Sequence, residues 1–278
     1  MRFAINVPNF GAIGDARALA DQAHEAEDSG WDGFFLWDHI GANWGESRFA
    51  DPWLALTAIA LATSRITLGP IVTPLPRRRP WKVAREAVTL DHLSGGRLVL
   101  GVGIGTDAAQ EYSAYGELPD ARLHGQMLDE ALDILTGLWT GESFSYDGAH
   151  YHIHDVRYLP TPVQRPRIPI WVAGYWPHQK PFRRAARWDG LCPLADERLI
   201  TPNELRDALA FIQPLRPDPS APFDVLASGN TSGKDRAADA AVIAEWEAAG
   251  ATWWQEAWMP PDDTDLIRAR IRLGPPRA

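Results

Sequence analysis

Residues 66–105 read ITLGPIVTPLPRRRPWKVAREAVTLDHLSGGRLVLGVGIG. This stretch contains two short apolar runs, at 66–72 and 97–103, with helical spacing from Pro80 to about Leu93 between them. A crossover of this length joins parallel strands. Continuous rather than alternating apolar runs are typical of strands that are buried on both faces. The stretch therefore predicts one strand–helix–strand unit of a parallel sheet.

The same pattern recurs along the rest of the chain. Six further apolar runs, each followed by a segment with helical spacing, lie at 3–7, 33–37, 168–174, 189–194, 223–227 and 252–257. Eight successive strand–helix units predict a closed (β/α)8 TIM barrel, α/β in class, as a single domain over residues 1–278. A doubly wound open sheet has the same local pattern and stays the alternative.

Two segments fall outside the repeat. A polar, glycine-rich insert occupies residues 40–50, after the second predicted strand. Residues 144–154 alternate in polarity around Asp147-Gly148, which predicts a small hairpin. We expect both to decorate the barrel.

Composition excludes several classes of protein. The formal net charge of −9 argues against a nucleic-acid partner, because phosphate backbones are bound by basic surfaces. No segment has the roughly twenty apolar residues of a membrane span, and residues 1–8 enter a strand without a signal peptide. The single cysteine, Cys192, permits no internal disulfide and is interpreted as a small core residue. We expect a cytoplasmic protein with no membrane partner.

Because each predicted strand precedes its helix, the carboxyl ends of all eight strands should open on one face, where barrel active sites lie. For most of the reactions that barrel enzymes catalyse, the required residues are not found at these predicted strand ends. The three histidines at 150, 152 and 154 fall in the hairpin and predict a solvated face rather than a metal site, so no metal is expected. A glycosidase would have only Asp38 and Glu256 as its carboxylate pair, and no lysine ends a strand to form a Schiff base.

The string LDHLSGGRLVLGVGIG at 90–105, after a helix start with the sequence RRRP at 77–80, resembles the luciferase-like flavin- and deazaflavin-dependent oxidoreductases. The resemblance extends over nearly the whole chain. It implies a barrel enzyme that acts on a small organic substrate, commonly as a homodimer. The reading we favour is a monooxygenase that uses reduced FMN and O2. Hydride transfer by coenzyme F420 is the alternative, and a non-catalytic flavin-binding protein is a second one.

The resemblance also implies a set of site residues. The pair Asp38 and His39 would be catalytic, since an imidazole can donate or accept a proton near neutral pH. For His39, a hydrogen-bonded core histidine is the competing interpretation. The segments implied to bind the cofactor comprise a bulge, a glycine-rich strand end and a phosphate-binding segment: Val72 and Thr73; Gly103, Ile104 and Gly105; and Ala173, Gly174, Tyr175 and Trp176.

Aromatic residues on or near the open face predict an apolar substrate pocket. They are Phe10, Trp37, Trp44, Trp254 and Trp258. The arginines at 77–79 are interpreted either as phosphate partners or as a solvated or subunit-pairing face. No residue pattern indicates which substrate is bound.

Overall fold

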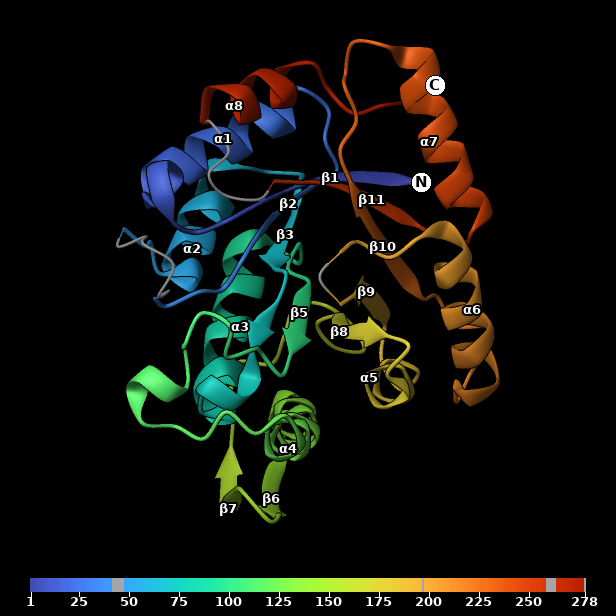
Figure 1. The fold of residues 1–278 in the computed structure, drawn as a ribbon. Coiled ribbons are helices and arrows are strands. Elements are labelled where there is room, and N and C mark those ends of the chain that lie inside the picture. The colour runs from blue at the N-terminus through green and yellow to red at the C-terminus, as the bar shows by residue number, and fades with distance from the viewer. Residues whose placement is uncertain (42–47, 197, 259–263, 278) are drawn as a thin grey trace.

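The computed structural model describes residues 1–41, 48–196, 198–258 and 264–277. Its main feature is a ring of parallel strands surrounded by helices (Figure 1). The strands of the ring, in their order around the sheet, are β3 (Thr67–Pro70), β2 (Gly33–Leu36), β1 (Arg2–Val7), β11 (Trp253–Ala257), β10 (Asp224–Gly229), β9 (Gly190–Ala195), β8 (Ile170–Trp176), β5 (Leu100–Gly103) and β4 (Thr73–Pro74).

The ring of strands closes where β3 meets β5. β3 and β4 are two parts of one strand position, separated by Ile71 and Val72, which are joined by a cis peptide bond. A parallel bridge links Leu68 to Leu98, and the backbone N–H of Val99 donates to the Leu68 carbonyl at 2.9 Å. The predicted (β/α)8 barrel is therefore confirmed, and the open-sheet alternative is wrong.

One helix follows each strand position and covers the outside of the barrel. These helices are α1 (Ala16–Asp28), α2 (Pro52–Ala62), α3 (Pro80–Ser94), α4 (Ala121–Trp139), α5 (Gln179–Ala185), α6 (Pro202–Ile212), α7 (Arg236–Ala248) and α8 (Thr264–Arg272). Asp15, Asp51 and Asp120 cap the first, second and fourth, each accepting two backbone N–H groups. No described helix combines the length and apolarity that a membrane crossing requires.

The predicted hairpin is confirmed as β6 (Ser143–Asp147) and β7 (His152–Arg157), which pair antiparallel. It projects from the barrel beside α4 (Figure 1). The exposed imidazole of His152 lies 2.6 Å from the exposed carboxylate of Asp147, so this histidine is on a solvated face, as expected.

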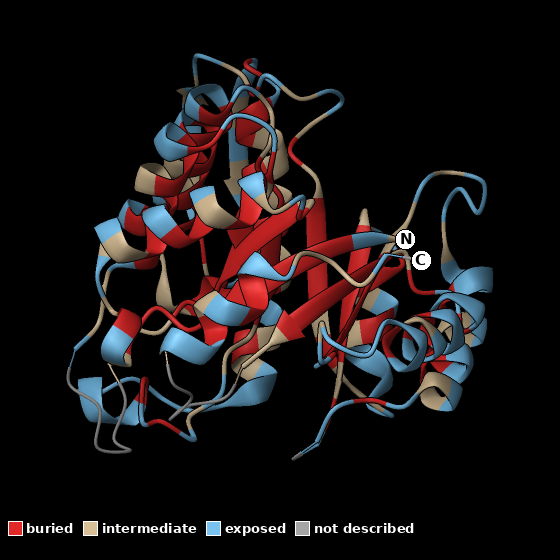
Figure 2. Ribbon diagram, turned by 90° about the horizontal axis from the view of Figure 1, so that it is seen from above, coloured by how far each residue is buried: buried red, intermediate tan, exposed pale blue. Residues whose placement is uncertain are grey.

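The barrel has two apolar cores, one on each side of its strands. The larger lies between strands and helices, and the strands are buried along their length (Figure 2). The smaller fills the amino-terminal half of the barrel interior, where the rings of Phe35, Trp171 and Trp253 contact one another with centroids 5.5–5.8 Å apart. Because these rings plug that end, space for a ligand remains at the carboxyl ends of the strands.

Glu27 ties α1 to the start of β3. Its carboxylate is buried and accepts the backbone N–H groups of Ser64, Arg65 and Ile66 at 2.6–3.0 Å. Burial by itself raises the pKa of Glu27, but these hydrogen bonds outweigh it and hold the pKa at about 2.

We predict that Glu27→Gln destabilises the protein at pH 7 and that the difference from the wild type shrinks as the pH falls toward 2. A carboxylate with a lowered folded pKa stabilises the fold above its unfolded pKa, and this contribution disappears as it is protonated. Urea unfolding between pH 7 and pH 3 measures the effect, with Glu142→Gln on the surface as the control. Parallel stability curves for Glu27→Gln and the wild type would contradict the assignment.

Candidate active site

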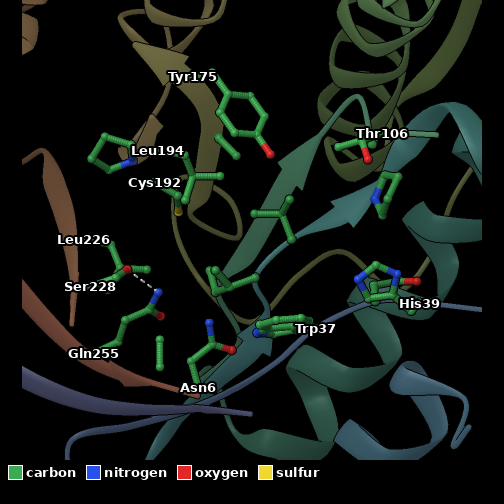
Figure 3. Close-up of a pocket in the computed structure, with 18 of the residues that line it drawn as sticks. Asn6, Trp37, His39, Thr106, Tyr175, Cys192, Leu194, Leu226, Ser228 and Gln255 are labelled. Carbon is green, nitrogen blue, oxygen red and sulfur yellow. Dashed lines mark hydrogen bonds between the residues drawn. The ribbon is translucent and has the colours of Figure 1, made fainter. Parts of the chain in front are cut away.

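A cavity of about 530 Å³ opens at the carboxyl ends of the strands. Its volume is in the range of pockets that bind small molecules and cofactors. Apolar side chains form most of its wall, and Figure 3 shows Trp37, Leu194 and Leu226 among the residues that surround it. The cavity therefore lies on the face that the order of strands and helices predicts.

The break between β3 and β4 forms one wall of the cavity. Ile71 and Val72 both line it. They lie against β5 because that strand has glycines there: a Cβ on Gly101 would come within 2.7 Å of the Ile71 side chain, and one on Gly103 within 3.0 Å of Val72. The bulge predicted at the end of the third strand is present, and Gly101 and Gly103 leave the space for it.

Asp38 is buried in an ion-pair network at the end of β2. Its carboxylate lies 3.0 Å from Arg77 Nη2 and 2.8 Å from Arg78 Nη2, and it accepts the Thr73 hydroxyl at 2.7 Å. Arg77 also donates to the Asp38 backbone carbonyl. These contacts fix Asp38 as a charged anchor for the arginines, so its geometry is that of a positioning residue.

Glu111 connects this network to His39. Arg77 Nη1 lies 2.7 Å from Glu111 Oε1, and His39 Nδ1 lies 2.7 Å from Glu111 Oε2. Burial raises the pKa of Glu111, but the His39 hydrogen bond and the Arg77 charge outweigh it, and the net pKa is lowered. Because the pKa of Glu111 is lowered, its carboxylate is the acceptor in this contact, and Nδ1 of His39 is the donor.

The backbone and ring of His39 are also held in place. Asn9 is fully buried; its side-chain amide donates to the His39 carbonyl at 2.7 Å, and its oxygen accepts the His39 N–H at 3.1 Å. The Phe10 ring meets the imidazole edge-on at 5.5 Å, and Trp37 lies 5.8 Å away. The imidazole is 23% exposed and lines the cavity, so it can reach a bound ligand.

The structure divides the predicted site residues into three groups. Those that line the cavity are Trp37, Asp38, His39, Val72, Gly105, Ala173 and Tyr175. Phe10 and Thr73 lie behind the lining and support His39 and Asp38. Outside the cavity lining are Gly103, Ile104, Gly174, Trp176, Trp254 and Trp258, and Trp44 lies outside the described residues.

The residues outside the lining have packing roles. Trp176 packs on Phe182, with ring centroids 5.1 Å apart, and a Cβ on Gly174 would lie 2.4 Å from Pro181, so both face α5. Trp254 is buried in the outer core and donates to Glu256 at 3.1 Å. Alternation along β11 explains this, because Trp253 and Trp254 point to opposite faces of the strand.

Several lining residues were not predicted from the sequence. Glu111 lies in the loop 104–120, and nothing in its spacing relates it to His39. The other cavity residues that were not anticipated come mainly from the inward-facing positions of β1 and β11 and from the segment after β9: Asn6, Gln255, Arg198 and Leu199. A polar Asn6 between apolar residues of a buried strand was a signal that could have been used.

Comparison with known proteins gives the family. The family model described as luciferase-like monooxygenase matches residues 1–258. The chain is 35% identical over 163 residues to an F420-dependent glucose-6-phosphate dehydrogenase of Microbacterium testaceum. The matched region covers 57% of this chain and 47% of that protein. The chain belongs to the luciferase-like monooxygenase family, and it spans about half the length of the curated relatives it matches.

Solved structures share the fold. An F420-dependent secondary alcohol dehydrogenase, in complex with an F420–acetone adduct, superposes with a TM-score of 0.80 at 19% identity and covers 99% of this chain and 98% of that one. The monooxygenase RslO1 from Streptomyces bottropensis gives 0.75 at 22% identity and covers 98% and 97%. Both confirm the barrel predicted from sequence.

We predict that Asp38→Asn destabilises the protein by about 3–5 kcal/mol, because it removes one partner of a buried ion pair and leaves two arginines without it. Urea unfolding measures this. Asp133→Asn is the matched control, since Asp133 pairs with Arg187 at 3.2 Å on the surface, and such pairs contribute about 1 kcal/mol or less. Equal effects of the two substitutions would contradict the structural role of Asp38.

Proposed function

We propose that this chain is an oxidoreductase that transfers a hydride between a small alcohol or carbonyl compound and a deazaflavin cofactor of the F420 type. The observation that carries the proposal is the His39–Glu111 pair, fixed beside an apolar cavity. The names of the sequence relatives, F420-dependent dehydrogenases, support the choice of cofactor.

The cavity suits a flat ring. The bulge at Ile71 and Val72 offers an apolar surface, and Gly105 and Ala173 add small residues beside it. Gly105 has a φ of 71°, and a Cβ there would lie 2.7 Å from the Tyr112 hydroxyl, so the backbone comes close to the cavity only because this residue is glycine. These residues would hold the ring, and Tyr175 would lie at its border.

The cofactor, when bound, supplies a ring carbon that accepts or returns a hydride. His39 supplies the proton chemistry. As an alcohol carbon loses its hydrogen with two electrons and the C–O bond becomes a carbonyl, Nε2 of His39 takes the hydroxyl proton. In the reverse direction it returns that proton to the carbonyl oxygen.

Glu111 and Arg77 position this base. Glu111 fixes the tautomer of His39 through Nδ1 and stabilises the imidazolium that forms. Arg77 in turn holds the Glu111 carboxylate at 2.7 Å. The surrounding wall is mostly apolar, which strengthens these interactions.

The reading favoured from sequence, a monooxygenase with reduced FMN and O2, would use the same cavity and the same imidazole. The relatives at 33–35% identity support F420 instead. A protein that only binds flavin would not need a histidine held by a buried carboxylate, so the pair also supports turnover.

Titration with F420 and with FMN, each oxidised and reduced, tests the cofactor. We expect saturable binding of F420 and reduction of the bound F420 by a secondary alcohol. Saturable binding of FMN alone would contradict the proposal and favour the monooxygenase.

We predict that His39→Ala keeps F420 binding and lowers turnover on the order of a hundredfold or more, since it removes general acid–base catalysis. The measurements are fluorescence titration and steady-state rates. His154→Ala, on the exposed hairpin, is the control. An unchanged rate for His39→Ala would remove this residue from the mechanism.

We also propose a homodimer that pairs through α2. The sequence of this helix, PWLALTAIALA, carries no charge, and Leu54 and Leu61 are 70% and 69% exposed on its outer face. Exposed apolar helix faces of this kind mark interaction sites.

We predict that Leu54→Glu with Leu61→Glu gives a monomer in size-exclusion chromatography with light scattering, where the wild type has about twice the 30.8 kDa chain mass. Leu266→Glu, which alters an exposed leucine of α8, should leave the dimer intact. A monomeric wild type would contradict the proposal.

A further inference from the structure

The inner end of the cavity contains buried oxygens without partners. No group of the described residues donates to Asn6 Oδ1 or Gln255 Oε1. The two residues are only 4% and 5% exposed, and both line the cavity. The Ser228 hydroxyl oxygen accepts a hydrogen bond from Gln255 Nε2 at 2.6 Å (Figure 3). A buried acceptor without a donor costs free energy, which a ligand that donates a hydrogen bond would recover.

These three residues, the amide patch, lie across the barrel from the proposed ring site. They come from β1, β10 and β11, which are neighbours in the sheet: Gln255 is in register with Ala4 of β1 and with Ser228 of β10. The ring site comes from the β3–β4 break, β5 and β8 on the other side of the circle. A ring on that side leaves the amide patch facing the remaining space.

His39 borders the same space. It follows β2, which is the neighbour of β1 in the sheet. Figure 3 shows Asn6 and Trp37 between His39 and Gln255 along one side of the cavity. A substrate whose reacting carbon lies at His39 would therefore extend its far end along Asn6 toward Gln255.

The charges of the cavity favour a neutral substrate. Among the described lining residues the cations are Arg77 and Arg198. Arg77 pairs with Asp38 and Glu111, and Arg198 pairs with Glu204 at 2.5 Å. Leu194, Leu199 and Leu226 provide apolar wall. Because both arginines are already paired with carboxylates, this lining does not suit a phosphate group. The names of the sequence relatives, by contrast, include a phosphorylated sugar as substrate.

We infer that the substrate is a neutral, largely apolar alcohol or ketone with a second hydrogen-bond donor, a hydroxyl or N–H, at the end away from the reacting carbon. Asn6 and Gln255 accept from that donor and determine specificity. The inference rests on the proposed function for the reaction, but recognition of the donor does not require turnover.

The test compares cyclohexanol with cyclohexane-1,2-, 1,3- and 1,4-diol as substrates of the F420-loaded protein. We expect the ratio of kcat/KM for one diol to kcat/KM for cyclohexanol to be about ten, because one added hydrogen bond to a buried acceptor has an effect of this size. Asn6→Leu and Gln255→Met should each bring that ratio near one, mainly through KM. Gln22→Met is the matched control, because Gln22 of α1 is also a buried amide with an unpartnered oxygen but lies outside the cavity lining.

A second readout separates recognition from reaction. Thermal unfolding of the protein without cofactor, with each of the four compounds, should show a larger stabilisation by the preferred diol, and this difference should vanish in the two variants. If neither F420 nor FMN supports turnover but this difference holds, the proposed function fails and the amide patch stands. If either Asn6→Leu or Gln255→Met does not fold, the diol preference of the other variant tests the inference.

Three results would overturn the inference. One is a wild type with no preference for any diol in either readout. Another is a preference that survives both substitutions. The third is weaker F420 binding in the variants with an unchanged diol ratio, which would assign the amide patch to the cofactor.

Discussion

The geometry of the site depends on the two ion pairs of the Arg77 guanidinium. This guanidinium lies between two buried carboxylates, Asp38 at the end of β2 and Glu111 in the loop after β5. With Arg78 paired to Asp38, the cluster has two positive and two negative charges, so their burial is compensated. Loops that are far apart in sequence are thereby held together, and the orientation of His39 follows from Glu111.

The layers of the barrel explain why chemistry occurs at one end. At the amino-terminal half, Phe35, Trp171 and Trp253 fill the interior. Above them lies a layer with Asn6 and Gln255, and the cavity opens beyond it. Because strand residues alternate between interior and exterior, a few positions per strand determine the floor of the cavity.

The strands, the order of the helices and the hairpin could be predicted because they depend on local signals: apolar runs, helical spacing between them, and Asp147-Gly148. His39 was found because it follows a strand end inside a recognisable motif. Glu111 could not be found, since its pairing with His39 exists only after the loop folds over the barrel mouth. Trp254 was predicted to line the pocket because it lies near the end of a strand. Side chains alternate along β11, however, and this alternation turns Trp254 to the outer core.

A crystal structure of the protein with oxidised F420 would place the cofactor ring relative to His39. We expect the tricyclic ring to lie against Ile71 and Val72, with His39 still bonded to Glu111 and its imidazole facing the space beside the ring. A ring bound elsewhere, or an imidazole turned away from the cavity once the cofactor is present, would contradict this expectation.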